Sequence, residues 1–199
     1  MASHLVHGRP LPDHVAGHVA LELCNTKALW GLPTEKEYLT DFTALLLWAQ
    51  EHQLISVAEG GALRDEPPAR QRAALRDVRR LRDTLYTTVT NLDSPLTDLG
   101  RYVARAVGRS SYVETDATVQ FRAPLSHTVL VDRAALEAHE LMATYGPAAV
   151  GLCASPACGW VFLDPSHRRR WCIMAICGNR AKARRHADRR RPTANDRLR

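Results

Sequence analysis

The chain of 199 residues is long enough for one domain with a hydrophobic core, or for one domain with a small appended module. Its 45% hydrophobic and 24% charged residues are typical of a soluble protein, and no stretch approaches the roughly 18 apolar residues of a membrane span. The net charge of +6 is unevenly placed, because residues 167–199 hold twelve Lys/Arg and two Asp/Glu, or +10, which leaves −4 for residues 1–166. This separation of charge indicates a compact body with a distinct basic segment that binds a polyanion.

The first residues contain neither a basic region nor the apolar core of a signal peptide. We therefore expect a cytoplasmic protein, in which cysteines stay reduced and bind metal in preference to forming disulfides. Residues 1–14 contain Gly8, Pro10 and Pro12, and this pattern predicts a flexible arm. His14 and His18 have helical i, i+4 spacing, but without a third ligand in view we do not expect them to bind metal.

Helical periodicity accounts for most of the following hundred residues. It predicts a helix over 15–29, a second helix that is capped by Thr40 or Asp41 and ends near 52–55, and a long helix over 69–92. Gly60-Gly61 and Pro67-Pro68 predict a loop between the second helix and the long one. A further helix is expected after Ser94-Pro95, ending at Gly108.

The composition changes between residues 110 and 131, where aromatic and β-branched residues predict two or three short strands. Asp132 is then expected to cap a helix over 133–145, which Gly146-Pro147 ends. These patterns, together with the four cysteines in the basic C-terminal segment, predict an α+β fold: a mostly helical N-terminal domain with a small antiparallel sheet, followed by a C-terminal Cys₄ zinc finger that ends in a basic helix. The predicted boundaries are a flexible arm at 1–14, an α+β domain at 15–149, the finger at 150–192 and a basic tail at 193–199.

Four of the five cysteines form two matched pairs near the C-terminus. Cys153-x₄-Cys158 is followed by thirteen residues and then by Cys172-x₄-Cys177. Two short-range pairs of soft thiolate ligands are typical of a tetrahedral zinc site. We therefore predict one structural Zn²⁺ per chain, which would supply much of the folding free energy of so small a module.

Spacing alone leaves three alternatives open: buried free thiols, disulfides, and an iron–sulfur cluster, which also uses four thiolates. Cys24 lies far from the pairs and is expected in the hydrophobic core. The second cysteine pair is predicted to belong to the last helix, with Cys172 at its start and Pro192 beyond its end.

Basic residues surround the second cysteine pair. Residues 168–170, just before the second pair, form the arginine loop. If zinc ties this loop to the last helix, the basic residues form one surface, on which Arg and Lys contact phosphates while Asn179 or an arginine reads base edges. The alternative interpretation of these basic residues is a charged tail that is only solvated. The predicted DNA-binding residues are Arg168, Arg169, Arg170, Asn179, Arg180, Lys182, Arg184, Arg185, His186 and Arg189.

Residues 172–182, with Arg169-Arg170-Trp171 before them, resemble the CGNR zinc finger, which is named for residues such as Cys177-Gly178-Asn179-Arg180. Residues 153–164 fit the same family. The segment Leu21-Glu22-Leu23-Cys24-Asn25-Thr26 resembles the opening of the ABATE domain, in which a hydrophobic residue and three residues of any type precede Asn-Thr. The resemblance implies a stress-induced bacterial transcription regulator whose finger binds DNA.

The N-terminal domain offers few signs of chemistry. The chain has no Gly-rich phosphate loop, nucleophile elbow or HExxH motif, so we do not expect an enzyme. Asn25, Thr26 and Trp30 form a candidate effector pocket, although a structural role for the Asn-Thr pair is the favoured interpretation. Effector sensing, homodimerisation or both are expected of this domain.

The sequence therefore predicts a DNA-binding transcription regulator that recognises double-stranded DNA and contains structural zinc. The alternative is a zinc-finger module that docks on an acidic protein partner, since a basic face suits either. A small-molecule-binding enzyme is a third class, and it would need a pocket with several converging titratable groups.

Overall fold

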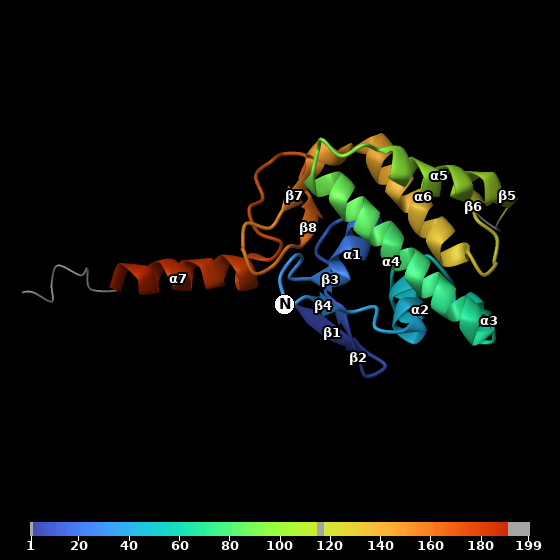
Figure 1. The fold of residues 1–199 in the computed structure, drawn as a ribbon, viewed down its shortest axis with the longest axis horizontal. Coiled ribbons are helices and arrows are strands. Elements are labelled where there is room, and N and C mark those ends of the chain that lie inside the picture. The colour runs from blue at the N-terminus through green and yellow to red at the C-terminus, as the bar shows by residue number, and fades with distance from the viewer. Residues whose placement is uncertain (1, 115–117, 191–199) are drawn as a thin grey trace, which may run out of the picture.

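The computed structural model describes residues 2–114 and 118–190. A body of packed helices occupies most of the molecule, and the last helix, α7 (Asn179–Arg190), points away from it (Figure 1). The strands form four separate two-stranded antiparallel pairs, so the α+β prediction is confirmed, with several small sheets in place of one. No helix in the described part of the chain is long and apolar enough to cross a membrane.

The N-terminal segment is a β-hairpin, in contrast to the flexible arm predicted for it. Strands β1 (Ser3–Val6) and β2 (Arg9–Pro12) pair antiparallel, with Ser3 opposite Pro12. His7 and Gly8 turn the chain with positive φ angles of 48° and 77°. Leu11 is fully buried in the main core. The burial of this side chain anchors the hairpin, and the prolines lie on a short two-stranded edge where a missing N–H costs little.

Helix α1 (Val19–Asn25) is much shorter than the predicted helix over 15–29. Gly17 has φ +79°, which ends any helix on its N-terminal side, and the His18 side chain caps α1 by accepting a hydrogen bond from the Ala20 amide. Thr26 ends the helix. The chain then forms the short pair β3 (Lys27–Ala28) and β4 (Lys36–Glu37).

Helix α2 (Phe42–Glu51) begins as predicted, with the Asp41 side chain accepting a hydrogen bond from the Ala44 amide. The loop predicted around Gly60-Gly61 is wrong, because α3 (Val57–Arg64) occupies it. A capping box starts α3: Ser56 and Glu59 each accept a hydrogen bond from the other's backbone amide. The favourable cap outweighs the low helix propensity of two glycines.

Three long helices complete the body (Figure 1). They are α4 (Pro68–Thr90), α5 (Thr97–Arg109) and α6 (Val129–Thr144). The apolar stripe predicted on the long helix is buried in the main core, with Val78, Leu81 and Leu85 fully inaccessible to solvent. Helix α6 starts three residues before Asp132, so that residue lies in the first turn and is not the predicted cap.

The remaining elements are short and connect the body to the cysteines. Strands β5 (Ser111–Glu114) and β6 (Val119–Arg122) form an exposed hairpin. The 3₁₀ turn η1 (Pro147–Ala149) leads into β7 (Val150–Leu152), which pairs with β8 (Val161–Leu163). The π-helical turn η2 (Met174–Gly178) continues directly into α7.

Strand β8 joins two hydrophobic cores. Val161 packs into the main core of the body, whereas its neighbours Trp160 and Phe162 pack with the four paired cysteines, Tyr38 and Ala28. Successive residues of a strand point to opposite faces, so a single strand can serve both cores. The cysteine module is thus built onto the body.

Candidate metal centre and basic surface

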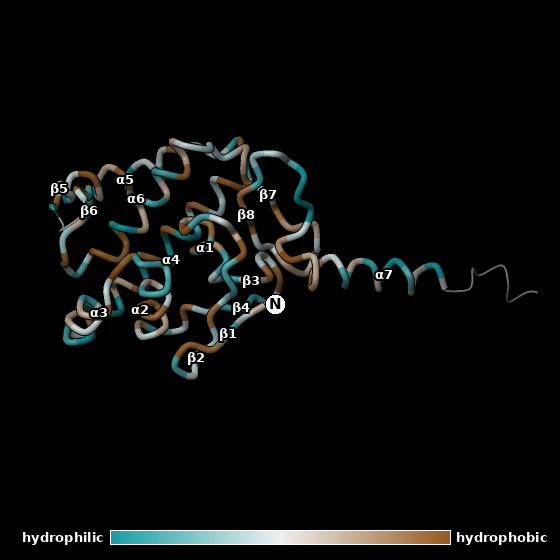
Figure 2. The backbone as a smooth tube through the Cα atoms, turned by 180° about the vertical axis from the view of Figure 1, so that it is seen from behind, coloured by the Kyte–Doolittle hydropathy of each residue, from teal (hydrophilic) through white to brown (hydrophobic). Residues whose placement is uncertain are grey.

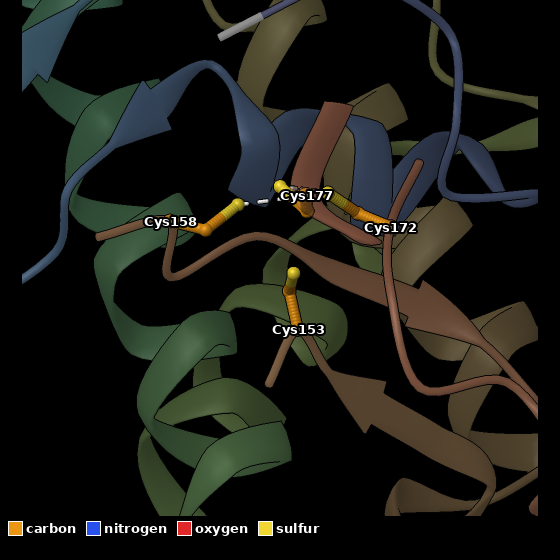
Figure 3. A group of neighbouring side chains, drawn as sticks. All are labelled: Cys153, Cys158, Cys172 and Cys177. Atoms are coloured by element: carbon orange, nitrogen blue, oxygen red, sulfur yellow. Dashed lines mark hydrogen bonds between the residues drawn. The ribbon is translucent and has the colours of Figure 1, made fainter. Parts of the chain in front are cut away.

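The four paired cysteines converge on one point (Figure 3). Cys153 follows β7, Cys158 precedes β8, Cys172 lies before η2 and Cys177 lies within η2. All four are buried, and their sulfur atoms lie within 4.8 Å of one another. The distance between the sulfurs of Cys158 and Cys172 is 3.5 Å, and that between Cys172 and Cys177 is 3.6 Å.

These distances fit a tetrahedral zinc ion. A Zn–S bond of about 2.3 Å places neighbouring sulfurs of a tetrahedron about 3.8 Å apart. The first cysteine pair is held in position by the backbone, because the Cys153 amide donates to the Trp160 carbonyl at 2.9 Å and the Cys158 carbonyl accepts from the Leu29 amide at 2.8 Å. The site therefore needs only small sulfur movements to close on one ion.

The electrostatics of the cluster also favour a bound cation. Hydrogen bonds from Cys158 and Cys172 lower the pKa of Cys153 to about 2. The hydrogen bonds with Cys153 and Cys158 raise the pKa of Cys172, because a second thiolate would lie beside the Cys153 thiolate. Neighbouring thiolates this close repel one another unless a positive charge lies between them. None of the five cysteines forms a disulfide, so the four thiols of the cluster are available as ligands for a divalent metal.

The second cysteine pair differs from the prediction in one respect: Cys172 lies outside the helix. Ile173 has extended backbone angles, φ −140° and ψ 119°, so the helical turn begins only at Met174. The Cys177 amide then donates back to the Ile173 carbonyl at 2.9 Å. The extended residue followed by a wide π-turn lets both sulfurs face the same point, which a continuous α-helix over these residues would not provide.

Gly178 allows this turn to pack closely. A Cβ atom at this position would lie 2.3 Å from the Met174 sulfur and 3.2 Å from Cδ1 of Trp171. The glycine that follows Cys177 thus has a steric role: it lets the Met174 and Trp171 side chains cover the backbone next to the site.

The residues of the predicted effector pocket connect the body to the cysteine module. The Asn25 side chain is fully buried, donates from Nδ2 to the Val161 carbonyl at 3.0 Å and accepts the Val161 amide at Oδ1 at 2.9 Å. Thr26 is also fully buried; its Oγ1 donates to the Leu23 carbonyl and accepts from Arg82. These contacts support the structural interpretation of the Asn-Thr pair.

Trp30 takes part in the same connection. Its ring stacks on Tyr86 with 3.8 Å between centroids and an angle of 6° between planes. The Tyr86 hydroxyl donates to the carbonyl of Gly159, which lies between Cys158 and β8. Gly159 has φ +73°, and a Cβ there would lie 3.0 Å from Cβ of Trp30. Trp30 therefore packs against the backbone of the metal loop, the segment from Cys153 to Gly159.

The arginine loop before the second cysteine pair is ordered by Asp164, whose role the sequence analysis missed. Its carboxylate accepts hydrogen bonds from the Arg168 and Arg169 amides at 3.2 and 2.8 Å. The Arg169 guanidinium donates to the backbone carbonyls of Val15, Trp171 and Cys172. Arg169 therefore holds the loop in place, and all three arginines, Arg168, Arg169 and Arg170, are exposed to solvent.

Helix α7 carries the other basic residues, and they are exposed. Only Ala181 is buried among the side chains that the structure describes on this helix. Figure 2 shows that α7 is mostly hydrophilic along its length. None of its cationic side chains has an ion-pair partner among the described residues. The exposed residues of the predicted set are Asn179, Arg180, Lys182, Arg184, Arg185, His186 and Arg189. The predicted tail at 193–199 lies outside the described residues.

Comparison with known protein families gives two matches. Residues 17–156 match the ABATE family, described as "Putative stress-induced transcription regulator", and residues 150–190 match the CGNR zinc finger. No curated protein matches the chain. The finger match agrees with the converging cysteines, which fit one structural zinc ion in preference to the iron–sulfur cluster that spacing alone left open.

Proposed function

The chain belongs to the ABATE family and carries a CGNR zinc finger, and from this premise we propose that it regulates transcription by binding double-stranded DNA through α7 and the loop before η2. Cys153, Cys158, Cys172 and Cys177 would hold the zinc ion. Bound zinc would supply a structural crosslink between the arginine loop and the start of α7. The proposed function involves no catalysed reaction and places the protein in the cytoplasm of a bacterium.

The observation that carries this proposal is a basic helix whose cationic side chains are exposed and form no ion pair with the residues that the structure describes. A helix that packs on its own protein has a buried apolar face, but α7 has described side chains exposed all around it after Ala181. An isolated helix of twelve residues is marginally stable in water. A helix of this kind gains most from an external polyanion that neutralises its charge.

The dimensions of α7 suit a DNA groove. Twelve residues at 1.5 Å each give a length of about 18 Å, and the major groove, about 12 Å wide, admits an α-helix. In this arrangement Arg180, Lys182 and Arg184 contact phosphates, and Asn179 at the first turn is placed to reach base edges. Arg168 and Arg170 extend the cationic surface beyond the metal site.

The helical body would supply the regulatory input. We assign effector sensing or homodimerisation to residues 15–149, with the finger at 150–192 as the DNA-binding unit. The contacts of Asn25 and Trp30 couple these two parts, because both residues bind the backbone next to the cysteines. A conformational change in the body would therefore reach the metal loop through direct contacts.

Selection of DNA fragments by the purified chain tests the proposal. We expect enrichment of fragments that share a sequence, and affinity that falls steeply with salt, because each phosphate contact contributes about −0.9 to the slope of log K against log salt. Replacing Arg180, Lys182 and Arg184 together with alanine is expected to reduce that slope by about 2.7.

A matched control removes the same charge elsewhere. Arg70, Arg72 and Arg76 are exposed near the start of α4, at the far end of the body from α7 (Figure 1), and their replacement should leave the slope unchanged. An unchanged affinity and slope in the α7 variant would refute the proposal. Recovery of an acidic protein without any DNA preference would instead support the alternative, a protein-docking finger.

A further inference from the structure

A second cluster of metal-binding side chains lies at the N-terminal hairpin. His4 lies on β1, His14 lies in the loop after β2, and Glu51 is the last residue of α2. Each residue offers one ligand atom, and these atoms all lie within 4.8 Å of one another. The sequence spacing suggested His18 as the metal-binding partner of His14, but His18 contacts Glu140 instead.

The distances suit a single ion. Nε2 of His4 lies 2.9 Å from Oε1 of Glu51, and Nε2 of His14 lies 3.7 Å from Oε2 of the same carboxylate. Metal–nitrogen and metal–oxygen bonds of about 2.0–2.2 Å place ligand atoms of a tetrahedral ion about 3.3–3.6 Å apart. The His4 distance is shorter than this range and the His14 distance is close to its upper end, each measured to a different oxygen of the Glu51 carboxylate.

One ligand atom of the cluster is unsatisfied. Oε2 of Glu51 is buried without a hydrogen-bond partner, and the His14 nitrogen is too far away to provide one. A buried carboxylate oxygen without a partner is costly. A cation between Glu51, His4 and His14 would satisfy it.

The surroundings of His4 match those of a metal-bound histidine. Nδ1 of His4 lies 3.2 Å from Oδ1 of Asp13, so this nitrogen can donate its hydrogen to a carboxylate. Nε2, which is within hydrogen-bond distance of Oε1 of Glu51, would exchange that contact for the ion. A carboxylate that orients a metal-ligating histidine in this way is a common feature of protein metal sites. Asp13 and Glu51 together carry two negative charges, which a divalent cation neutralises.

We propose that His4, His14 and Glu51 form a second metal site, for a divalent first-row transition metal ion. Two imidazoles and one carboxylate suit ions such as Zn²⁺, Co²⁺ and Ni²⁺, in contrast to the all-thiolate site. The side chains of His4 and His14 are 39% and 46% exposed, so the ion reaches the site from solvent and keeps open coordination positions. Unlike the cysteine site, this one exchanges its metal readily.

Metal binding here would connect three separate segments of the body. His4 and Glu51 are 47 residues apart, and the ion would tie the β1–β2 hairpin to the end of α2. This site is independent of the proposed DNA contacts, since it uses none of the residues of the finger or α7.

Titration of the full chain with Co²⁺, after loading of the cysteine site with one zinc ion, tests this inference. Calorimetry and metal analysis should show a second ion bound per chain. We expect His14→Ala and Glu51→Gln each to weaken the second binding event at least tenfold, while both variants retain the first zinc ion. Retention of that zinc shows that the variants are folded.

His139→Ala is the matched control, because this histidine is exposed on α6 and belongs to neither site. It should leave the second affinity unchanged, which separates the cluster from weak binding to any surface histidine. A stoichiometry of one metal ion per chain would overturn the proposal. So would a second binding event that both His14→Ala and Glu51→Gln leave intact.

Discussion

Replacing Asn25 with alanine removes the side chain that joins helix α1 to strand β8. Its amide makes two hydrogen bonds, both to the backbone of Val161, at 3.0 and 2.9 Å. Asn25 is fully buried, as is Val161. Alanine therefore leaves a buried carbonyl and a buried N–H without partners at the edge of the strand that serves both cores.

The expected cost follows from those two groups. An unsatisfied buried polar group costs about 1–3 kcal/mol, and a water molecule entering the space left by the amide would recover part of this cost. We expect the free energy of unfolding to fall by about 3 kcal/mol. For a chain of this length, about 2–4 °C of melting temperature is lost per kcal/mol, so the midpoint should fall by about 6–12 °C.

Thermal unfolding of the zinc-loaded protein, followed by circular dichroism, measures this change. Asn91→Ala is a suitable control, because Asn91 is exposed at the end of α4 and accepts one weak hydrogen bond from the Asp93 amide at 3.3 Å. The control should unfold within about 2 °C of the unmodified chain. If the melting temperature of Asn25→Ala changed as little as that of this control, the reasoning that Asn25 joins the body to the cysteine module would be refuted.

Two further substitutions test the packing and the electrostatics of the same region. Burial raises the pKa of Glu22 to about 7, so the folded state keeps a proton that the unfolded state releases above about pH 4.5, and stability is lost as pH rises through that window. Glu22→Gln should reduce the loss of unfolding free energy between pH 6 and 8 by about 1 kcal/mol. Plots of unfolding free energy against pH that run parallel for the two proteins would contradict this. Gly151→Ala would place a Cβ 2.4 Å from Cε2 of the buried Phe162 ring and should cost about 1–3 kcal/mol in urea unfolding. Gly61→Ala, which meets open space on α3, should be neutral or slightly stabilising, and equal effects of the two alanines would rule out the steric explanation.

Local signals were sufficient for several elements. Asp41 caps α2 as expected, and the 3.6-residue stripe predicted the long helix α4 almost to its ends. Both signals depend on side chains within a few positions of one another. The loop predicted at Gly60-Gly61 shows how such signals compete: two glycines predicted a break, whereas the equally local capping box of Ser56 and Glu59 starts a helix there.

Other features arise from contacts between distant segments. Arg82 is one of several arginines of α4, but the structure buries it to 2% exposure, where it donates to Glu37 at 2.8 Å. Glu59 likewise pairs with Arg133, and the hydrogen bond from that arginine is the main reason that the pKa of Glu59 falls to about 2. No periodicity identifies which charge in a helix will find a buried partner.

The sequence by itself determined the four clustered cysteines as candidate metal ligands and the basic segment beside them, because ligands in short-range pairs and clustered charge can be recognised from spacing and composition. The tertiary structure decided how these features are used. It shows that Cys172 precedes the helix, that Arg169 binds carbonyls of its own chain, and that the described side chains of α7 beyond Ala181 are exposed. It also brings His4 beside Glu51. These outcomes depend on which surfaces the folded chain buries, and burial is a property of the whole structure.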